Sequence, residues 1–408
     1  MNLHILQRTM STTFLPLLRH EFHRILHDEG LLIFLLLVPL GYPLLYTFIY
    51  TNEVVREVPA IAVELSGSSL GRQFLRQVDA TPDVHIIRQA SSMDEARQLM
   101  QQGHAYGIIY IPTDFDQQLH TGRQAHVSLF CDMSGLLYYK ALLMACTDVS
   151  LLMNKEIQAT LSPSATRRQI AVSTEPVRYE SIAFFNPQTG FASFVIPAVL
   201  ILIIQQTLLL GAGLTAGTDR DRHLPITQAF SLPVLTARAT AYLLVTVATS
   251  SWMLVAVPHL FRLPQLADAA TLALFLLPYL LACILLALLL SRWVREREAC
   301  MLLFVFTSVP LLFLSGISWP GASIPPFWQT VSWLFPSTFG INGYVRINTM
   351  GASLSDVSTE WFALWAQAAI YLLALLFVCR GRKKSRHKSP KFPIHSSSFG
   401  QRHFSFLS

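Results

Sequence analysis

The segment Met301–Met350, MLLFVFTSVPLLFLSGISWPGASIPPFWQTVSWLFPSTFGINGYVRINTM, decides how the chain folds. It begins with the uncharged apolar run Met301–Leu314, which Gly316 and Pro320 then interrupt. A membrane helix that ends at Gly and Pro frees backbone N–H and C=O groups that lipid cannot satisfy, so the break must be buried in protein or face a watery cavity. The Trp residues that follow are typical of the headgroup layer. We therefore expect a span that reaches the outer surface and folds partly back into it; a plain exterior loop with interfacial aromatic residues is the alternative.

The composition of the whole chain is that of a membrane protein. Of its 408 residues, 52% are hydrophobic and only 13% are charged, which is too apolar for an ordinary soluble protein. Uncharged runs long enough to cross about 30 Å of hydrocarbon recur along the chain. They are Leu31–Tyr50, Thr189–Ala216, Ala239–Leu260, Ala269–Leu290, Ala299–Ile317 and Trp361–Val378.

The basic residues orient these spans. Three Lys or Arg residues precede the first span, three lie between the second and third, three lie between the fourth and fifth, and eight follow the last. The opposite short loops carry only Arg262 and Arg346. By the positive-inside rule, both termini are expected in the cytoplasm and the insert after the first span outside. The net charge of +6 is thus a topology signal and does not indicate a nucleic-acid partner.

The insert between the first two spans has the pattern of a folded domain. Short strands are expected at Ala60–Glu64, Val84–Arg88, Tyr106–Ile111 and His126–Cys131, with helices near Ser69–Val78, Ser92–Gln102 and Asp114–His120. Alternating strands and helices predict a small mixed α/β domain. Ser92 with Glu95 predicts a capping box, and Leu136–Leu161 predicts a long helix that carries the chain back toward the membrane. Cys131 and Cys146 could pair in an oxidising compartment or remain as two buried thiols.

The predicted fold is a membrane all-α bundle of six transmembrane helices, arranged one plus five around an inserted mixed α/β extracytoplasmic domain. Residues 1–30 form a cytoplasmic amphipathic interface helix and residues 31–50 the first transmembrane helix. The α/β domain covers 51–185, the five-helix transmembrane domain with its re-entrant exterior segment covers 186–379, and a basic disordered cytoplasmic tail covers 380–408.

The segment before the first span predicts a helix that lies in the inner membrane interface. Phe14, Leu18, Phe22, Ile25 and Leu26 recur at helical spacing, and basic residues cover the other side. Three of these, His20, His23 and His27, also stand at a spacing that would suit a metal. We favour a solvated basic face, because the His-Glu-x-x-His order of zinc peptidases is not met.

The second span carries polar and small residues in its interior. Gln205 and Gln206 lie near its middle, and either line a substrate path or tie helices together. Gly211 and Gly213 permit close approach of helix backbones, and we predict that they pack a dimer.

The six runs contain no charged residue, which argues against several transport mechanisms. The nearest charges, Arg238, Asp268 and Glu360, mark their ends. Ion-coupled transporters place ionisable groups at depth, so a gradient-driven transporter is not favoured. The sequence also lacks a Gly-x-x-x-x-Gly-Lys-Ser/Thr loop, so energy for uphill transport must come from another chain.

These motifs together resemble the permease subunit of ABC type-2 exporters, in the drug- or lipid-export branch that has a large extracytoplasmic domain. The resemblance covers roughly residues 14–379. It rests on Leu18–Phe22 through Asp28, on the insert motifs Ile111-Pro112, Asp114-Phe115 and Asp132, and above all on Leu314–Pro320 and Pro336–Ala352. The one-plus-five arrangement of spans also matches.

The resemblance implies a subunit of the bacterial inner membrane that carries no catalytic residues and binds no cofactor or metal directly. ATP and Mg²⁺ would bind cytoplasmic ABC ATPase subunits. The other implied partners are a second permease copy or a sibling permease, membrane lipids and, in some systems, a periplasmic adaptor of the membrane-fusion type. The cargo would be hydrophobic or amphipathic, drug-like or lipid-like.

The resemblance also assigns site residues. The ATPase-facing surface would include Arg19, Phe22, Arg24, Asp28, Arg220 and Arg222. The transport pathway and its exterior gate would include Gln205, Gln206, Ser315, Gly316, Trp319, Pro320 and Trp328. The family's loop after the second span often continues with Gly-Thr, whereas His223-Leu224-Pro225 stands here, so the ATPase contacts differ in detail. A non-transporting receptor or scaffold that displays the α/β domain is the alternative function, although six spans exceed what an anchor needs.

Overall fold

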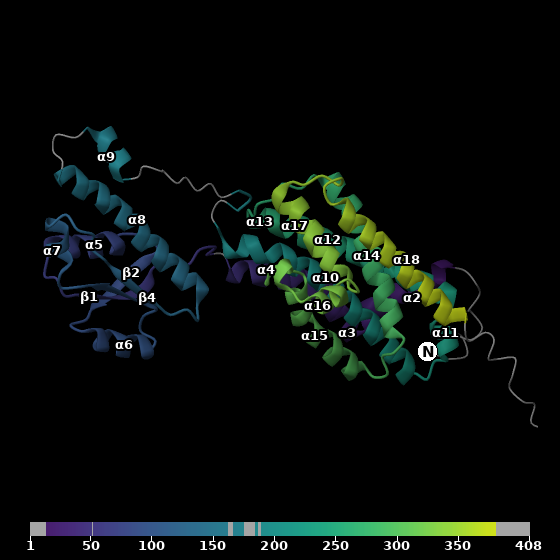
Figure 1. The fold of residues 1–408 in the computed structure, drawn as a ribbon. Coiled ribbons are helices and arrows are strands. Elements are labelled where there is room, and N and C mark those ends of the chain that lie inside the picture. Colours follow the sequence, from purple (N-terminus) through teal and green to yellow (C-terminus); the bar gives the residue numbers. More distant parts are fainter. Residues whose placement is uncertain (1–13, 51, 162–165, 175–183, 187–188, 381–408) are drawn as a thin grey trace, which may run out of the picture. The chain divides into compact units, whose positions relative to one another are not determined.

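The computed structural model describes residues 14–50, 52–161, 166–174, 184–186 and 189–380. The chain divides into two compact units: residues 50–191 form one, and the residues before and after them form the other. Figure 1 shows the elements of both. The predicted cytoplasmic tail beyond Arg380 lies outside the described residues.

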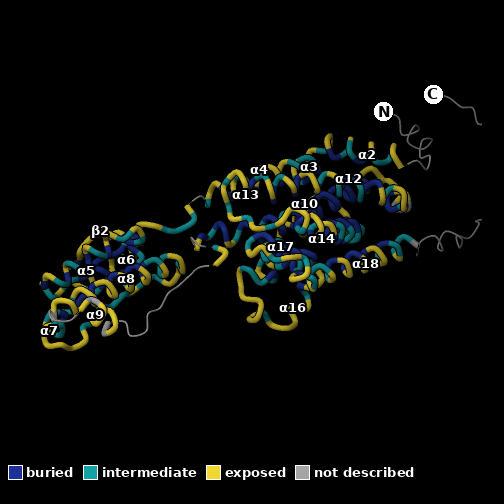
Figure 2. Tube along the Cα trace, turned by 90° about the horizontal axis from the view of Figure 1, so that it is seen from above, coloured by how far each residue is buried: buried dark blue, intermediate teal, exposed yellow. Residues whose placement is uncertain are grey.

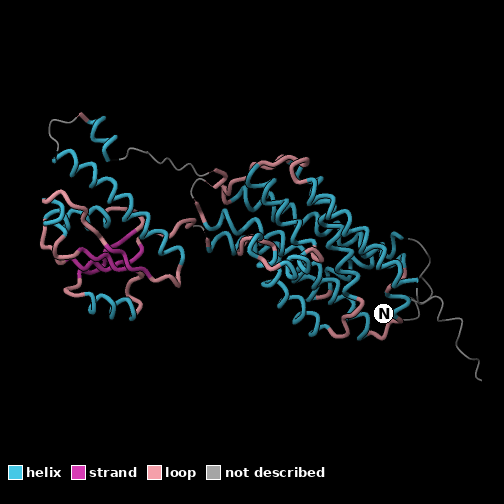
Figure 3. The backbone as a smooth tube through the Cα atoms, viewed as in Figure 1, coloured by secondary structure: helices cyan, strands magenta, loops and turns pink. Residues whose placement is uncertain are grey.

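The smaller unit is built on a four-stranded sheet, drawn in magenta in Figure 3. The strands β1 (Val58–Glu64), β2 (Val84–Gln89), β3 (Gly107–Ile111) and β4 (Ser128–Cys131) lie in the order β2-β1-β3-β4. β1 runs parallel to both of its neighbours, and β4 runs antiparallel to β3. The predicted small mixed sheet is confirmed, with strand ends within two residues of those expected.

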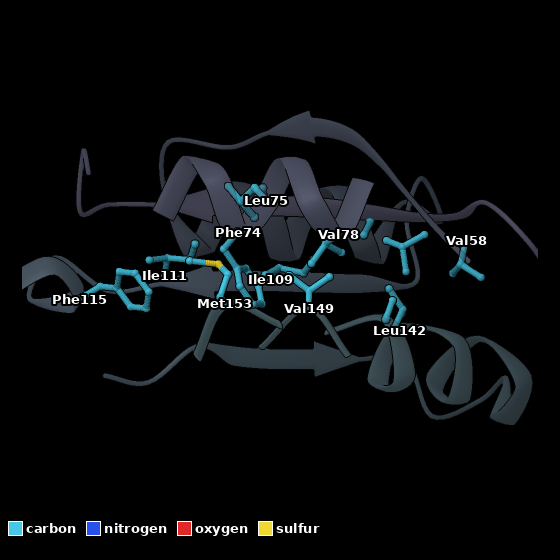
Figure 4. Packing of buried hydrophobic residues seen from close by; sticks show 14 residues of the cluster. Val58, Phe74, Leu75, Val78, Ile109, Ile111, Phe115, Leu142, Val149 and Met153 are labelled. Atoms are coloured by element: carbon cyan, nitrogen blue, oxygen red, sulfur yellow. The ribbon is translucent and has the colours of Figure 1, made fainter. Parts of the chain in front are cut away.

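Helices cover both faces of this sheet, and the side-chain alternation along β1 explains how. Ala60 and Ala62 face the helices α5 (Ser69–Asp79) and α8 (Leu136–Leu161), whereas Ile61 and Val63 face α6 (Met93–Gln101). Successive strand residues point to opposite faces, so a strand covered on both sides is apolar throughout. Figure 4 shows the core on the α5–α8 side.

α8 belongs to the core of the smaller unit. Its buried residues Leu142, Val149 and Met153 recur at helical spacing and pack on the sheet with Phe74 and Ile109 (Figure 4). A Cβ on Gly107 would lie 2.6 Å from Cδ1 of Leu142, so only glycine lets the helix approach β3 this closely. This packing places one face of α8 in the core of the smaller unit.

The predicted capping box at α6 forms with one change of partner. Ser92 Oγ accepts the backbone N–H of Glu95 at 3.2 Å, as expected. The Glu95 carboxylate reaches back to the N–H of Ser91, at 2.9 Å, and not to that of Ser92. α7 (Phe115–His120) and α9 (Arg167–Thr174) complete the described helices of this unit.

The larger unit is helical. Its elements are α2 (Phe14–His27), α3 (Glu29–Leu32), a π-helical turn (Ile33–Leu37), α4 (Val38–Ile49), α10 (Phe191–Asp221), α11 (Ile226–Ala229), α12 (Leu232–Ser251), a second π-helical turn (Trp252–Ala256), α13 (Val257–Leu260), α14 (Ala269–Ser291), α15 (Arg297–Leu314), a 3₁₀ turn (Gly321–Ser323), α16 (Pro326–Ser332), α17 (Pro336–Met350) and α18 (Ser358–Arg380).

Among the described residues, 7 helical segments are long and apolar enough to cross a membrane. They are Glu29–Ile49, Leu136–Thr160, Phe191–Asp221, Leu232–Leu260, Ala269–Ser291, Arg297–Leu314 and Ser358–Cys379. The six predicted runs overlap all of them except the segment in α8. α10 forms the buried centre of the larger unit, and most of its residues are dark blue in Figure 2.

Gly211 and Gly213 of α10 allow other helices of the same chain to pack closely. A Cβ on Gly211 would lie 2.7 Å from Leu35 Cδ2, and one on Gly213 would lie 2.1 Å from Cys300 Sγ. Both glycines are buried. The predicted close approach of helices is therefore present, with the first apolar segment and α15 of the same chain as the neighbours, and the packing of a dimer by these glycines stays a prediction.

The helical path is interrupted after α15, within the segment Met301–Met350. Residues 315–335 form turns and the short α16, much of which is exposed, whereas α17 is buried along one face (Figure 2). Gly340 lies against the Tyr279 ring and Gly343 against the Phe275 ring, so α17 packs closely on α14. The apolar run is thus followed by a second helix that returns into the helical unit.

Candidate functional site

A network of buried charges joins α2 to the helical unit. α2 packs along α12, and its buried residues are Glu21 and Ile25. Glu21 is 4% exposed, so its carboxylate faces protein and not water. The prediction of a solvated basic face is wrong for Arg24, which lies one turn further on and also points into the unit, with its side chain 9% exposed.

Arg238 lies at the centre of the network. Its Nη2 donates to Glu21 Oε1 at 3.1 Å and to Asp219 Oδ2 at 3.0 Å, and its Nε donates to Glu21 Oε1 at 3.3 Å. The residue is 2% exposed. The predicted third span begins at Ala239, but α12 begins at Leu232, so Arg238 stands inside the helix.

Arg24 and Asp219 close the network from the other side. Arg24 Nη1 donates to Asp219 Oδ1 at 2.7 Å, and Nη2 donates to the Thr215 carbonyl at 2.7 Å. Thr215 Oγ1 and the Tyr242 hydroxyl lie 2.7 Å apart. Glu21 and Asp219 thus face Arg24 and Arg238 in equal number. Burial of charge is tolerated only when each group is paired in this way.

A second ion pair ties the start of the first apolar segment to α15. Arg297 donates to both carboxylate oxygens of Asp28, at 2.7 and 3.1 Å, and to Thr218 Oγ1 at 2.8 Å. The same carboxylate caps α3 through the N–H groups of Gly30 and Leu31. Burial disfavours the ionised form of Asp28, but the hydrogen bond and charge of Arg297 outweigh it, so the pKa of Asp28 falls below its ordinary value.

The six residues predicted to dock an ATPase fall into two groups. Arg24 and Asp28 are held by the ion pairs just described, and Arg220 Nη2 donates to the Arg292 carbonyl at 2.6 Å. Arg19 and Arg222 are exposed, and Phe22 is half-buried. Sequence reasoning missed Glu21 and Arg297 and read Arg238 as a terminal charge. Glu21, Arg24 and Asp28 recur at three- and four-residue spacing, which places them on one helix face and could have indicated the network.

The predicted pathway residues in α10 differ in their partners. Gln205 Oε1 accepts the backbone N–H of Ser337 at 2.8 Å, so this side chain ties α10 to the first turn of α17. Gln205 Nε2 and both polar side-chain atoms of Gln206 are buried without a hydrogen-bond partner among the described residues. Ser337 Oγ and Tyr344 Oη are likewise buried without a hydrogen-bond partner among the described residues. α10 and α17 therefore carry buried polar groups with unused hydrogen-bonding capacity.

The structure brings together only two of the predicted exterior-gate residues. Ser315 and Gly316 line a cavity of about 170 Å³ with residues of α16, α17 and α18. Trp319 is 54% exposed and Trp328 is 50% exposed, and Pro320 is also exposed. Across the described part of the chain, His, Cys, Asp and Glu residues form no group of three that could hold a metal ion.

Comparisons with known proteins place this geometry in context. A family model described as "ABC-2 family transporter protein" matches residues 30–377. The chain is similar to "Probable multidrug ABC transporter permease YbhR" of Escherichia coli (strain K12), with 22% identity over 86% of this chain and 92% of the relative. It is also similar to "Linearmycin resistance permease protein LnrN" of Bacillus subtilis (strain 168), with 21% identity over 84% of this chain and 94% of the relative.

Proposed function

Since the chain belongs to the ABC-2 family of transporter proteins, it is a membrane component of an ABC exporter, and we propose that it is a permease driven by a separate ATPase subunit. Its cargo is a hydrophobic or amphipathic molecule, drug-like or lipid-like, that leaves the cytoplasm or the inner leaflet. The main support for the proposal is the buried network of Glu21, Arg24, Asp219 and Arg238. Its ion pairs hold α2 against α10 and α12, so these helices are expected to move together.

In this proposal, six of the seven candidate helices span the inner membrane. α8 is left out because its apolar face already packs on the sheet. The basic loops support a cytoplasmic location for both termini, and they put residues 50–191 outside. α2 then lies at the cytoplasmic surface, held to the end of α10 through Arg24 and Asp219.

The network explains how motion at α2 would reach the bundle. If α2 moved alone, it would leave Arg238 and Asp219 buried with an unpaired charge, which costs several kcal/mol. The lower-cost response is for α2, α10 and α12 to move together. The Asp28–Arg297 pair adds α15 to this set, and α15 leads directly to the broken segment at residues 315–335. ATP-driven closure of the ATPase subunits would therefore shift the broken segment at residues 315–335.

The unsatisfied polar groups of α10 and α17 support a cargo route beside these helices. Gln206 and Tyr344 offer buried donors and acceptors that a passing amphipathic molecule could use. Transport requires that cargo interact differently with two conformations, because a molecule bound equally in both is not pumped. The broken segment with Trp319 and Trp328 would open the exterior side in one of them.

The partners follow from the same reasoning. Cytoplasmic ABC ATPase subunits bind ATP with Mg²⁺ and contact the exposed surface around Arg19, Phe22 and Arg222. A second permease, identical or a sibling, completes the membrane part of the exporter, and lipids surround it. The unit at residues 50–191 is large enough to receive a periplasmic adaptor protein.

The test is ATP-dependent transport in inside-out membrane vesicles that hold the permease and a candidate ATPase encoded beside it. We expect the two proteins to co-purify and a fluorescent lipophilic cargo to accumulate with ATP but not with a non-hydrolysable analogue. Vesicles without the permease are the control. Failure of any such ATPase to associate, or equal accumulation without nucleotide, would refute the proposal.

A further inference from the structure

The long helix α8 has a second apolar face that the described residues leave exposed. Its core side, which includes Leu142 and Val149, points to the sheet (Figure 4). On the other side of the helix, Leu137, Met144 and Leu151 are 44%, 49% and 40% exposed. They lie seven residues apart, so they form one stripe along the helix axis. This α8 stripe has the spacing of a seam that packs against another helix.

Two opposite charges lie beside the α8 stripe, at equal distances from its centre. Lys140 and Asp148 stand four residues before and after Met144, and both are exposed. In the described part of the chain, neither of them makes an ion pair. A charged side chain in hydrocarbon is costly, so lipid does not suit this face. A protein surface that carries matching charges does.

A second copy of α8 supplies those charges when the two helices run antiparallel. In a pair whose two-fold axis passes beside Met144, residues at equal distances before and after Met144 lie opposite one another. Lys140 of one copy then lies opposite Asp148 of the other, and the symmetry forms the same contact twice. Leu137 lies opposite Leu151 at both ends of the seam, and the two Met144 side chains meet at its centre. The stripe is therefore complementary to itself.

The same charges disfavour the parallel arrangement. A parallel pair in register would place Lys140 beside Lys140 and Asp148 beside Asp148. Like charges that face each other across a helix seam are destabilising, and charges in these flanking positions set the orientation of paired helices. The apolar residues alone would fit either direction, so it is the charge pattern that selects the antiparallel one.

We propose that α8 is a contact between two copies of this chain, which pack their α8 stripes antiparallel about a two-fold axis at Met144. The inference rests on the proposed function for the presence of a second permease, and it names that permease as a second copy and not a sibling. A sibling would need both the apolar spacing and the two charges at the matching positions.

The test is oxidative disulfide cross-linking of the full chain, expressed in membranes without an ATPase and without added nucleotide. Met144→Cys should give a cross-linked dimer, because its two thiols meet at the axis. Leu137→Cys alone should not, because its two copies lie about 21 Å apart along the antiparallel pair, beyond the reach of a disulfide. Leu137→Cys co-expressed with a differently tagged Leu151→Cys chain should cross-link. The wild type with its five cysteines is the baseline.

Charge exchange separates a specific contact from chance collision. In the Met144→Cys chain, Lys140→Glu faces Asp148 of the other copy and should lower the cross-linked fraction by about threefold, the scale of an exposed ion pair. Addition of Asp148→Lys restores opposite charges and should restore the cross-link. Arg123→Glu makes the same change at an exposed residue outside the stripe and should have no effect. Thermal unfolding of each variant detects any loss of folding, which is a different effect from loss of contact.

Two results would overturn the assignment. Strong cross-linking of Leu137→Cys alone would indicate a parallel pair. Absence of the Met144→Cys cross-link would exclude the contact, whether the thiol reacts freely with a maleimide, as on an uncovered face, or is shielded by another protein such as an adaptor. Because no transport is measured, loss of ATP-driven export with the Met144→Cys cross-link intact would refute the proposed function alone. Export without the cross-link would refute this contact alone.

Discussion

Arg238 and Glu21 stand 217 positions apart in the sequence, yet Arg238 Nη2 lies 3.1 Å from Glu21 Oε1, with both side chains almost fully buried. The pair joins α2, which precedes the first apolar segment, to α12. Together with Asp219 and Arg24 it forms a closed set of charges in which each member has an opposite partner. The connection between α2 and the bundle therefore depends on electrostatics as well as on apolar packing.

Removal of Arg238 should destabilise the protein strongly. Arg238→Met leaves Glu21 without its guanidinium partner and Asp219 with only Arg24, and loss of one partner from a buried pair costs about 3–5 kcal/mol. Thermal unfolding in detergent measures the effect, with exposed Arg295→Met as the control. The double variant Glu21→Leu/Arg238→Met should lose less than the sum of the single variants. Strict additivity would contradict the pairing.

Arg19 and Arg24 should respond differently to charge reversal. Arg19 is exposed, so Arg19→Glu should reduce ATPase association and leave thermal stability unchanged. Arg24→Glu sets a second carboxylate against Asp219 and should destabilise the permease itself. Pull-down with the ATPase and a melting curve on the same samples separate the two effects. If Arg19→Glu lowered stability, or Arg24→Glu altered only association, the division of α2 into two faces would be wrong.

Acid should weaken the link between Asp28 and Arg297. The pKa of Asp28 lies below its ordinary 3.8 in the folded state, so its ionised form stabilises the fold at neutral pH. That contribution is complete above the unfolded-state value and is lost as the pH falls through the folded-state pKa. Melting temperature measured between pH 6 and pH 3 should fall less steeply for Asp28→Asn than for the wild type. Parallel curves would show that the pair carries no net stability.

Gly213 should tolerate no side chain, because a Cβ there would overlap Cys300 Sγ. Gly213→Val should cost about 1–3 kcal/mol through overpacking. Gly41→Val in α4 is the matched control, since nothing lies within 4 Å of its added Cβ. Thermal unfolding of both variants provides the measurement. Equal stability would mean that α10 and α15 can separate without loss.

The two cysteines of the smaller unit should react slowly. Burial raises the pKa of the Cys131 thiol to about 11 and that of Cys146 to about 12. At pH 8 their thiolate fraction is then roughly 100-fold or more below that of an ordinary cysteine. Iodoacetamide labelling followed by mass spectrometry checks this, with Ser134→Cys as an exposed reference. Rapid labelling of the folded protein would contradict these raised pKa values.

The sequence predicted the local structure well because that structure depends on local patterns. α8 matches its predicted bounds, and the alternation Ala60-Ile61-Ala62-Val63 follows directly from a strand covered on both faces. Apolar runs likewise located the helices of the larger unit. These features need only periodicity, capping residues and breaks, all of which lie within a few positions of one another.

The ionic network could not be predicted in the same way, because its formation depends on which side chains meet across long sequence separations. Arg238 stands beside an apolar run and resembles a terminal charge until Glu21 and Asp219 are placed around it. Gly211 and Gly213 of α10 show the same limit: their spacing indicated close approach, but only the fold identifies Leu35 and Cys300 as the neighbours.

The measurement that tests the account most directly is the number of cargo molecules moved per ATP hydrolysed, in vesicles that contain the permease and its ATPase. Glu21→Gln keeps an acceptor for Arg238 but removes one charge from the network. We expect this variant to bind the ATPase and support hydrolysis at the wild-type level, while the transport-to-hydrolysis ratio falls at least tenfold. An unchanged ratio in the folded variant would contradict the claim that α2 transmits the motion through its buried charges.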